Sequence, residues 1–272
     1  MGSLITALAS YCDIKQRGGQ WYVRIDDIDP LRYDPTALEA ILSSLSVHGL
    51  HGDGPVRYQS QRLPRYLEAR DQLSQMSYYC NCSRSKLKTA TVYPGFCRHK
   101  LQYADDHAVR LSVDNRPRSF IDAIQGSRRY IPAEQFGDFV IWRRDDLVTY
   151  HLATAVDDAE QYSHVLRGSD LYQQTPPQLV LMEALGLNSP DYAHIPVLTY
   201  ADGTKLSKQT HAPALNNATP QANLKMALAF LGQTPPNEDF TVNQWLSWGV
   251  KNWRLDAVPM ALKPFDLSQT AD

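Results

Sequence analysis

Apolar residues recur at helical spacing in several stretches of the chain. In residues 3–15, Leu4, Leu8 and Tyr11 fall on one face, which predicts a helix with Ser3 as its N-cap. The same spacing returns from Pro220 onward, in a helix that Gly232 should end. The other stretches with helical spacing are 37–50, 62–77 and 178–185.

Short β-rich runs lie between these helices. The predicted strands are 21–25, 139–142, 148–150, 162–166 and 195–200. Between residues 78 and 99 the pattern gives way to a loop-rich module. Strands alternating with helices predict an α/β fold, namely a doubly wound parallel sheet split by a smaller inserted domain.

Composition and charge restrict the function without defining it. The 272 residues are 43% hydrophobic, and 27 Lys and Arg nearly balance 29 Asp and Glu, for a net charge of -2. Any nucleic-acid contact therefore needs a local basic patch, for which the candidates are Arg84, Lys86, Lys88, Arg98 and Lys100. Neither a membrane-spanning run nor a secretory leader is visible, so we expect a cytoplasmic protein.

Two lysines follow the last predicted strand, in the sequence D-G-T-K-L-S-K-Q (202–209). Such a loop can bring the ammonium groups of Lys205 and Lys208 onto a triphosphate and offset charge as pyrophosphate leaves. A solvated basic loop would be the simpler interpretation of a bare K-x-x-K pair. The surrounding residues make the catalytic interpretation the better one.

An acidic cluster closes the first predicted strand, in the sequence R-I-D-D-I-D-P-L-R (24–32). Ligands bind at the carboxyl ends of strands in open α/β sheets, so Asp26 is placed to hold an ammonium group. Two later blocks, Y-H-L-A-T-A-V-D-D (150–158) and H-V-L-R-G-S-D (164–170), offer Tyr150 and Arg167. Arg binds a carboxylate through a planar fork of N–H groups. Taken singly, Tyr150 would be a core aromatic and Arg167 a surface ion-pair member.

Three of the four cysteines, Cys80, Cys82 and Cys97, lie within eighteen positions, which in a reducing compartment suggests a metal before disulfides. Zinc would need one further ligand, and both Tyr93 and His99 are candidates. Chemistry alone favours His99, because a phenol loses its proton only near pH 10.

These blocks together resemble the glutamyl-type class I aminoacyl-tRNA synthetases. Residues 202–209 are similar to their KMSKS signature, and residues 24–32 to their R-I-E-D-x-D-P-x-R segment, with Asp26 in place of a glutamate. The C-x-C then Y-x-x-x-C spacing looks like that of the glutamyl-queuosine tRNA(Asp) synthetases, which favours Tyr93, narrowly, as the fourth zinc ligand. About sixty residues follow the lysine signature, which also fits those small enzymes.

The resemblance implies an activity and roles for residues. Glutamate would be activated with ATP, with magnesium, and its glutamyl group passed to queuosine in the anticodon stem-loop of tRNA(Asp) by a monomeric enzyme. Asp26 would hold the ammonium, Tyr150 and Arg167 the amino acid, and Lys205 and Lys208 would be catalytic. The ATP-binding residues implied are Gly2, Ser3 and Lys208. One structural zinc would be held by Cys80, Cys82, Tyr93 and Cys97.

The resemblance also has a gap and leaves alternatives. The family opens with a strand and a P-S-P-T-G-x-L-H-x-G-S segment, of which only Met1-Gly2-Ser3 is present here. We therefore expect the start codon to lie further upstream. The alternatives are a truncated glutamyl-tRNA synthetase acting on the tRNA 3′ end, and a non-catalytic zinc-containing RNA- or nucleotide-binding remnant.

The resemblance and the hydrophobic pattern together predict that the chain has four parts. Residues 1–62 would form the first half of a Rossmann-like catalytic domain without its N-terminal strand, and 63–149 an inserted acceptor and zinc subdomain. Residues 150–210 would complete the catalytic domain with the lysine-bearing loop. Residues 211–272 would be a helical C-terminal segment.

Overall fold

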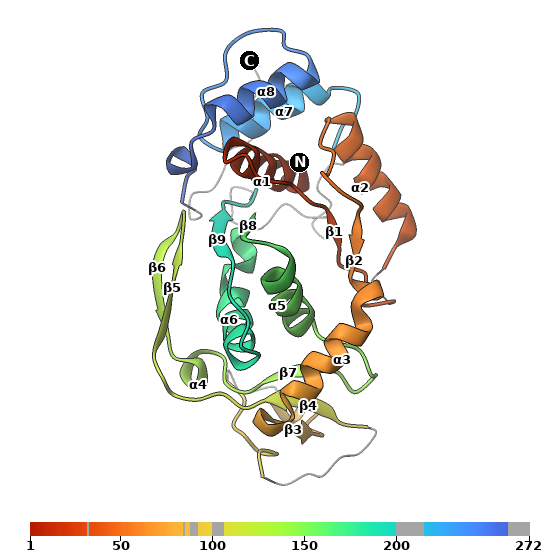
Figure 1. Ribbon diagram of the computed structural model, residues 1–272, viewed down its shortest axis with the longest axis vertical. Helices are drawn as coiled ribbons and strands as arrows, with labels where there is room; N and C mark the ends of the chain where they lie inside the picture. Colours follow the sequence, from red (N-terminus) through yellow and green to blue (C-terminus); the bar gives the residue numbers. More distant parts are fainter. Residues whose placement is uncertain (32, 84, 88–91, 100–105, 200–214, 261–272) are drawn as a thin grey trace.

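The computed structural model describes the chain except for residues 32, 84, 88–91, 100–105, 200–214 and 261–272. The described part is elongated, with helices α1, α7 and α8 at one end and strands β3, β4 and β7 toward the other (Figure 1). Its helices are α1 (Gly2–Gln16), α2 (Pro35–Val47), α3 (Leu63–Gln72), α4 (Pro132–Gln135), α5 (Tyr150–Gln161), α6 (Thr175–Ala184), α7 (Pro220–Phe230) and α8 (Val242–Asn252).

Nine strands are described, in three sheets. They are β1 (Arg24–Ile25), β2 (Arg57–Tyr58), β3 (Ser77–Cys80), β4 (Ala108–Leu111), β5 (Arg118–Asp122), β6 (Gly126–Tyr130), β7 (Phe139–Trp142), β8 (His164–Gly168) and β9 (Asp191–Ile195). The sheets have the strand orders β1-β2, β3-β4-β7 and β6-β5-β9-β8. Two pairs that belong to the predicted catalytic halves, β1-β2 and β8-β9, are parallel.

The expected α/β class is confirmed, but the described strands do not join into one doubly wound sheet. The β1-β2 pair and the β8-β9 pair lie in separate sheets. Strand β5 attaches to β9 in parallel where Asp122 lies opposite Tyr192, and it pairs with β6 as an antiparallel hairpin. The inserted segment therefore contributes a hairpin to the sheet that carries β8.

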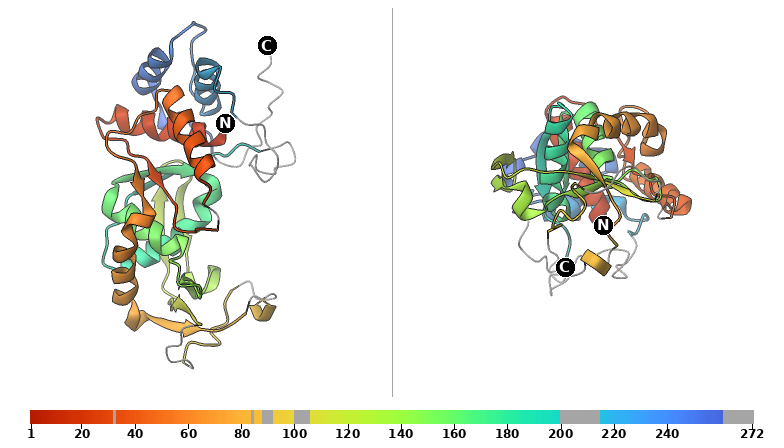
Figure 2. Two further views of the ribbon diagram at one scale, coloured as in Figure 1. Left: turned by 90° about the vertical axis from the view of Figure 1, so that its right-hand side faces the viewer. Right: turned by 90° about the horizontal axis from the view of Figure 1, so that it is seen from below.

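Two hydrophobic clusters hold these elements together. In the first, Leu4, Leu8 and Cys12 of α1 pack with residues of α7 and α8, including Leu228 and Trp245. The second lies under α3, α5 and α6 and includes the fully buried Leu152 and Leu181. The left view in Figure 2 again shows the N-terminal helix together with α7 and α8 at one end of the molecule. Burial of Cys12 in the first cluster keeps it apart from the other three cysteines.

Helix α7 ends where the sequence predicted. Its last residue is Phe230, and Gly232 follows with φ +73°, a left-handed conformation that glycine adopts without strain. A Cβ at Gly232 would also lie 2.1 Å from the carbonyl oxygen of Ala257. Both the turn and the close approach of the following chain therefore require glycine here.

Three local predictions are wrong. The strand predicted at 195–200 lies earlier in the chain, as β9, which ends at Ile195. Helix α1 begins at Gly2 with Met1 as its N-cap, so Ser3 lies inside the first turn and caps nothing. Residues 148–150 are not a strand, because Tyr150 is the first residue of α5 and only Val148 makes an isolated bridge, to Trp142. The side chain of Thr149 accepts a hydrogen bond from the backbone N–H of Leu152 and so starts the helix.

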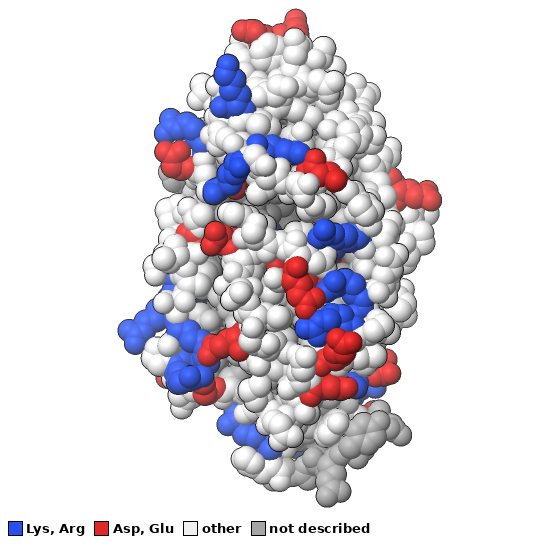
Figure 3. Space-filling view, in the orientation of Figure 1, with Lys and Arg blue, Asp and Glu red and all other residues white. Residues whose placement is uncertain are grey.

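Charges of both signs interleave on the face of the molecule in Figure 3. Two of the five basic residues proposed for an RNA-binding patch are described: Arg98 pairs with Asp138, and the ammonium of Lys86 lies 5.1 Å from the ring centre of Phe96. Arg84, Lys88 and Lys100 lie outside the described residues. Among the helices that the structure describes, none is both long and apolar enough to cross a bilayer.

Candidate active site and metal centre

The three residues predicted to bind glutamate come together from distant parts of the sequence. Asp26 directly follows β1, Tyr150 begins α5, and Arg167 lies on β8. Asp26 and Tyr150 line one open cavity of about 890 Å³. Burial raises the pKa of the Tyr150 phenol, while the nearby Arg167 and a hydrogen bond with Gln178 oppose that rise. The phenol of Tyr150 therefore lies within electrostatic reach of Arg167.

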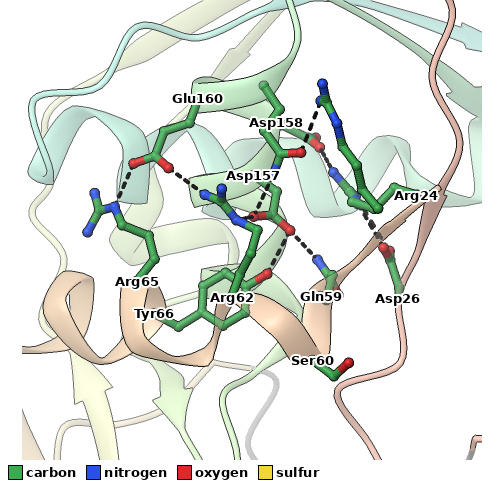
Figure 4. A network of polar contacts seen from close by, with 12 residues as sticks. Arg24, Asp26, Gln59, Ser60, Arg62, Arg65, Tyr66, Asp157, Asp158 and Glu160 are labelled. Carbon is green, nitrogen blue, oxygen red and sulfur yellow. Dashed lines mark hydrogen bonds and ion pairs between the residues drawn. The ribbon is translucent and has the colours of Figure 1, made fainter. Parts of the chain in front are cut away.

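Arg24 joins Asp26 to a buried carboxylate that the sequence did not single out. Its Nε lies 2.7 Å from Asp26 Oδ1, and its NH1 lies 2.7 Å from Asp158 Oδ1 (Figure 4). Burial alone would lower the pKa of Arg24, but the attraction of Asp158 and Asp26 outweighs it and raises the pKa. Asp26, the predicted ammonium ligand, thus has a cationic partner within the protein.

Asp158 lies between two arginines. Its second oxygen, Oδ2, is 3.7 Å from NH1 of Arg167 and accepts a hydrogen bond from the hydroxyl of Tyr192 at 3.3 Å. Burial raises the pKa of Asp158, although Arg24 and Arg167 act in the opposite direction. A continuous line of alternating charges therefore connects Asp26 with Arg167 through the interior.

The guanidinium of Arg167 is itself held by several protein groups. Its Nε donates to Nε2 of His194 at 3.0 Å, and its NH2 donates to Thr175 Oγ1 at 2.9 Å and to Gln178 Oε1 at 2.7 Å. The group lies 4.8 Å from the ring centre of Tyr192. Three of its N–H groups thus donate hydrogen bonds within the protein. Its NH1 group faces Asp158 in the cluster.

The neighbouring carboxylate of the V-D-D block has a different role. Asp157 is fully buried and accepts hydrogen bonds from Gln59, Tyr66 and Gln161, at 2.8, 2.7 and 3.1 Å. Arg62 adds an ion pair at 2.7 Å. Figure 4 shows the two adjacent side chains pointing to different partners, Asp157 toward α3 and Asp158 toward Arg24. Of these two successive residues of α5, Asp157 therefore has a structural role, and Asp158 faces the predicted glutamate site.

The residues predicted to contact ATP are only partly described. Lys205 and Lys208 lie outside the described residues. Gly2 and Ser3 form the first turn of α1, and both are exposed. The first N–H groups of a helix have no partner within it and favour negative charge. The start of α1 is thus compatible with a phosphate contact.

The three clustered cysteines meet at the other end of the molecule. Cys80 ends β3, and the sulfurs of Cys80, Cys82 and Cys97 all lie within 4.8 Å of one another. The Cys82 and Cys97 sulfurs are 3.6 Å apart. Two sulfurs bound to one tetrahedral zinc at about 2.3 Å would lie about 3.8 Å apart. The spacing fits a single zinc ion.

Tyr93, not His99, lies at the fourth corner of this cluster. Its hydroxyl oxygen is 3.5 Å from the Cys80 sulfur and 3.6 Å from the Cys82 sulfur. An oxygen ligand at about 2.0 Å from zinc would lie about 3.5 Å from such sulfurs. Within the part of the chain that the structure describes, His99 does not join the metal-compatible group.

The backbone near Tyr93 requires a glycine. Tyr93 forms a parallel bridge with Gly137, whose φ is +63°. A Cβ on Gly137 would lie 2.4 Å from a methyl carbon of Val92 and 3.3 Å from the Tyr93 nitrogen. Because glycine has no Cβ, the backbone at Gly137 can lie this close to Tyr93.

Arginines connect the cysteine cluster to the β3-β4-β7 sheet. Arg110 on β4 donates from Nε to the Cys80 sulfur at 3.2 Å, and its guanidinium lies 3.9 Å from the Tyr93 ring centre. Arg98 makes two hydrogen bonds to Asp138, which also accepts from the Tyr78 hydroxyl. Burial and hydrogen bonds with the cysteines raise the pKa of Tyr93, so a bound cation would have to supply the energy to ionise it.

Sequence reasoning missed several residues that build the site. Asp158 stood in a quoted block without a role, and His194, Thr175 and Gln178 were not considered. The Asp157-Asp158 pair could have indicated a site residue. Adjacent helix positions lie about 100° apart, so two successive carboxylates of one helix point to different neighbours. No comparable signal marked His194, which is buried on a strand among apolar residues.

Comparison with known proteins assigns the class. The family model described as tRNA synthetases class I (E and Q), catalytic domain, matches residues 1–93 and 96–231. The chain therefore belongs to the class I tRNA synthetases of the E and Q type and is a ligase.

Closer relatives narrow the assignment. A Glutamyl-Q tRNA(Asp) synthetase of Pseudomonas aeruginosa is 43% identical over 264 residues, which are 95% of this chain and 90% of the relative. One from Escherichia coli K12 is 44% identical over the same share of this chain and 86% of its own length. Within the class, the chain is a member of the glutamyl-Q tRNA(Asp) synthetase family.

Solved structures agree on the fold. A glutamate-tRNA synthetase from Elizabethkingia anophelis superposes with a TM-score of 0.80 at 23% identity, covering 99% of this chain and 66% of the solved chain. A glutamate tRNA ligase from Elizabethkingia meningosepticum, in complex with its amino acid, gives 0.79 at 23% identity, covering 99% and 65%. At this identity the likeness shows the fold alone, and the chain spans about two thirds of the solved chains.

Proposed function

We propose that this enzyme activates glutamate with ATP and transfers the glutamyl group to queuosine in the anticodon of tRNA(Asp). The observation that carries the proposal is the convergence of Asp26, Tyr150 and Arg167 on one polar cluster, in a chain 43–44% identical to proteins of that name over 95% of its length. An ammonium ligand and a carboxylate ligand in one polar cluster suit an α-amino acid.

The cluster supports a defined binding mode. The ammonium of glutamate would join Asp26 from the cavity side and compete with Arg24 for that carboxylate. The NH1 side of Arg167 and the phenol of Tyr150 would hold the amino acid from the other side. Asp26 is one methylene shorter than the glutamate of related enzymes, so the ammonium must come closer to β1. Catalysis would rest on this positioning and on charge stabilisation.

The nucleotide would bind at the start of α1. Backbone N–H groups of Gly2 and Ser3 would contact phosphate, and Lys208, with Lys205, would offset the charge that develops on pyrophosphate. ATP would bind as its complex with magnesium. This assignment of the two lysines rests on their sequence signature alone.

We propose one structural zinc per chain, held by Cys80, Cys82, Tyr93 and Cys97. The sulfur–sulfur and oxygen–sulfur distances support this set, as does Arg110 beside it, whose single positive charge offsets part of the negative charge of the four ligands. A zinc here would hold the end of β3, through Cys80, to the segment that carries Tyr93 and Cys97.

We further infer that the pairs β1-β2 and β8-β9 are two halves of one parallel sheet. A cavity of about 220 Å³ separates them, lined by Tyr22 and Arg24 on one side and Leu166 on the other. The carbonyls of Trp21 and Val23 accept from the β2 side, so the alternate backbone groups of Tyr22 and Arg24 face the cavity. A parallel strand in this gap would pair with both edges.

Glutamate-dependent exchange of pyrophosphate into ATP tests the activation step. We expect exchange with glutamate in the absence of tRNA and none with aspartate or glutamine. A truncated glutamyl-tRNA synthetase would need tRNA(Glu), and a non-catalytic protein would give no exchange under any condition.

The acceptor is tested separately. Labelled glutamate should appear on tRNA(Asp) that carries queuosine, and not on tRNA(Asp) without queuosine or on tRNA(Glu). Removing the 3′ terminal nucleotide should leave labelling intact. If labelling disappears with that nucleotide, glutamate was joined to the 3′ end and the proposed acceptor is wrong.

A further inference from the structure

A buried pair behind the predicted glutamate site controls how Arg167 is held. Asp122, the last residue of β5, and His194, on the adjacent β9, are both almost fully buried. Asp122 Oδ2 lies 2.5 Å from His194 Nδ1. The other histidine nitrogen, Nε2, accepts from Nε of Arg167 at 3.0 Å. The three side chains thus form one line from the β5-β6 hairpin to the site.

The contacts define the protonation state of the histidine. Nε2 faces an N–H of a permanent cation, so it must carry a lone pair, and the proton must be on Nδ1, where Asp122 accepts it. Burial lowers the pKa of His194, and Arg167 adds to the effect, although Asp122 opposes it. Burial alone would raise the pKa of Asp122, but hydrogen bonds from His194 and two backbone N–H groups lower it. An ionised Asp122 therefore faces a neutral His194.

Asp122 is held rigidly for this task. Its Oδ1 accepts the backbone N–H groups of Ile124, Gln125 and His194, at 3.0, 2.8 and 3.2 Å. The imidazole packs against Tyr192, with ring centres 6.0 Å apart, and against Tyr172 at 5.2 Å. These contacts hold the carboxylate and the ring in the observed orientation.

We propose that Asp122 and His194 are positioning residues, which fix the guanidinium of Arg167 so that its NH1 group, 3.7 Å from Asp158, stays directed at the predicted glutamate site. This inference rests on the proposed glutamate activity for its consequence, but not for the contact itself. Arg has many rotamers, and a group that must meet a carboxylate at a defined angle loses binding free energy when it is free to move. The hairpin of the inserted segment thereby helps to define amino-acid binding.

Substitutions at His194 separate this role from a merely structural one. The amide oxygen of Gln in His194→Gln can stand near Nε2 and still accept from Arg167. In His194→Asn the shorter amide stays near Nδ1, keeps a contact with Asp122 and leaves Arg167 without its acceptor. We expect glutamate affinity to fall at least about tenfold more in the Asn variant than in the Gln variant. The KM for ATP should stay within about twofold in both.

His164→Gln is the matched control. His164 lies on β8 and pairs with Asp191 of β9 at 3.5 Å, so it is a second histidine–aspartate pair in the same four-stranded sheet, but one that is exposed. It should leave glutamate affinity unchanged. Equal glutamate affinity in the Asn and Gln variants of His194, or a stronger loss in Gln, would overturn the proposal.

A nuclear magnetic resonance measurement tests the contact without substrate. The Nε–H of Arg167 should show scalar coupling across the hydrogen bond to His194 Nε2, and Asp122→Asn should remove or weaken it. Absence of this coupling from the parent protein, or its persistence in Asp122→Asn, would refute the positioning role. If the parent protein fails to bind glutamate but shows the coupling, the proposed substrate is wrong and the positioning of Arg167 stands.

Discussion

The two polar regions of the molecule differ in how their charges are balanced. In the cluster around Arg24, Asp158 and Arg167, each cation lies beside a carboxylate that the protein itself supplies. In the cluster of Cys80, Cys82, Cys97 and Tyr93, four groups that would be anionic as ligands converge with one nearby guanidinium. In the first region the charges of the protein's own side chains balance. In the second region the four ligands would carry more negative charge than the one guanidinium balances.

This difference predicts different behaviour toward ligands. A substrate entering the first cluster exchanges one ion pair for another, so binding should change the local structure little. The second cluster needs a cation to bring its ligands into their charged forms, so metal binding and local folding should be coupled. If the two regions are independent, a substitution in one should leave ligand binding in the other unchanged.

The largest effect should come from the metal site. Cys82→Ser removes one of three thiolates, and we expect complete loss of zinc from a protein that otherwise carries about one per chain. Hydrogen exchange should rise between residues 77 and 99, but not in the core of α1, α7 and α8. Cys12→Ala, in that other core, should keep its zinc. A Cys82→Ser protein with full zinc content would contradict the assignment.

Asp158→Asn should have the next largest effect. It leaves Arg24 and Arg167 without their shared buried carboxylate, and breaking a buried pair from one side costs about 3 kcal/mol of unfolding free energy. Glutamate affinity should fall as well, since both arginines can reorient. Zinc content should be unchanged. Denaturant unfolding, glutamate titration and metal analysis of one preparation check all three points.

Substitution of Asp157, one residue earlier, should have a smaller effect, on stability alone. Asp157→Asn weakens hydrogen bonds from Gln59 and Tyr66 and the ion pair with Arg62, which should lower the unfolding free energy by about 1.5–3 kcal/mol. Glutamate affinity should stay close to that of the parent protein, because none of these groups contacts Arg167. A loss of affinity equal to that of Asp158→Asn would mean that the two carboxylates act together.

The smallest effect concerns pH. Burial lowers the pKa of His151 and of His194 in the folded protein, so both bind protons more weakly there than in the unfolded chain. Unfolding free energy should therefore decrease as pH falls below about 6.5, by at most about 1.4 kcal/mol per pH unit for each histidine. His151→Gln should reduce this slope, as measured by denaturant unfolding between pH 7 and 5. An unchanged slope would show that His151 is protonated in the folded state.

The sequence predicted elements well where the hydrophobic pattern was long. Helices α1, α2, α3, α6 and α7 and strands β7 and β8 lie close to the predicted positions. It failed at α5, because the block beginning at Tyr150 followed a β-rich run and its apolar face was short. Strands β5 and β6 were not predicted, since each has two charged residues among its five and gave no continuous apolar run. The four-residue strands β3 and β4 were also missed.

The sequence by itself determined the chemistry that this protein has available. Motif order gave the family and named Asp26, Tyr150, Arg167 and the cysteine set, because chemical type and spacing are properties of the chain. Only the tertiary structure decided which groups meet. It put Tyr93 rather than His99 beside the sulfurs, turned Asp157 and Asp158 to different partners, and brought Asp122 to His194 across 72 positions. Contacts of this kind depend on how strands and helices pack, and no local pattern encodes them.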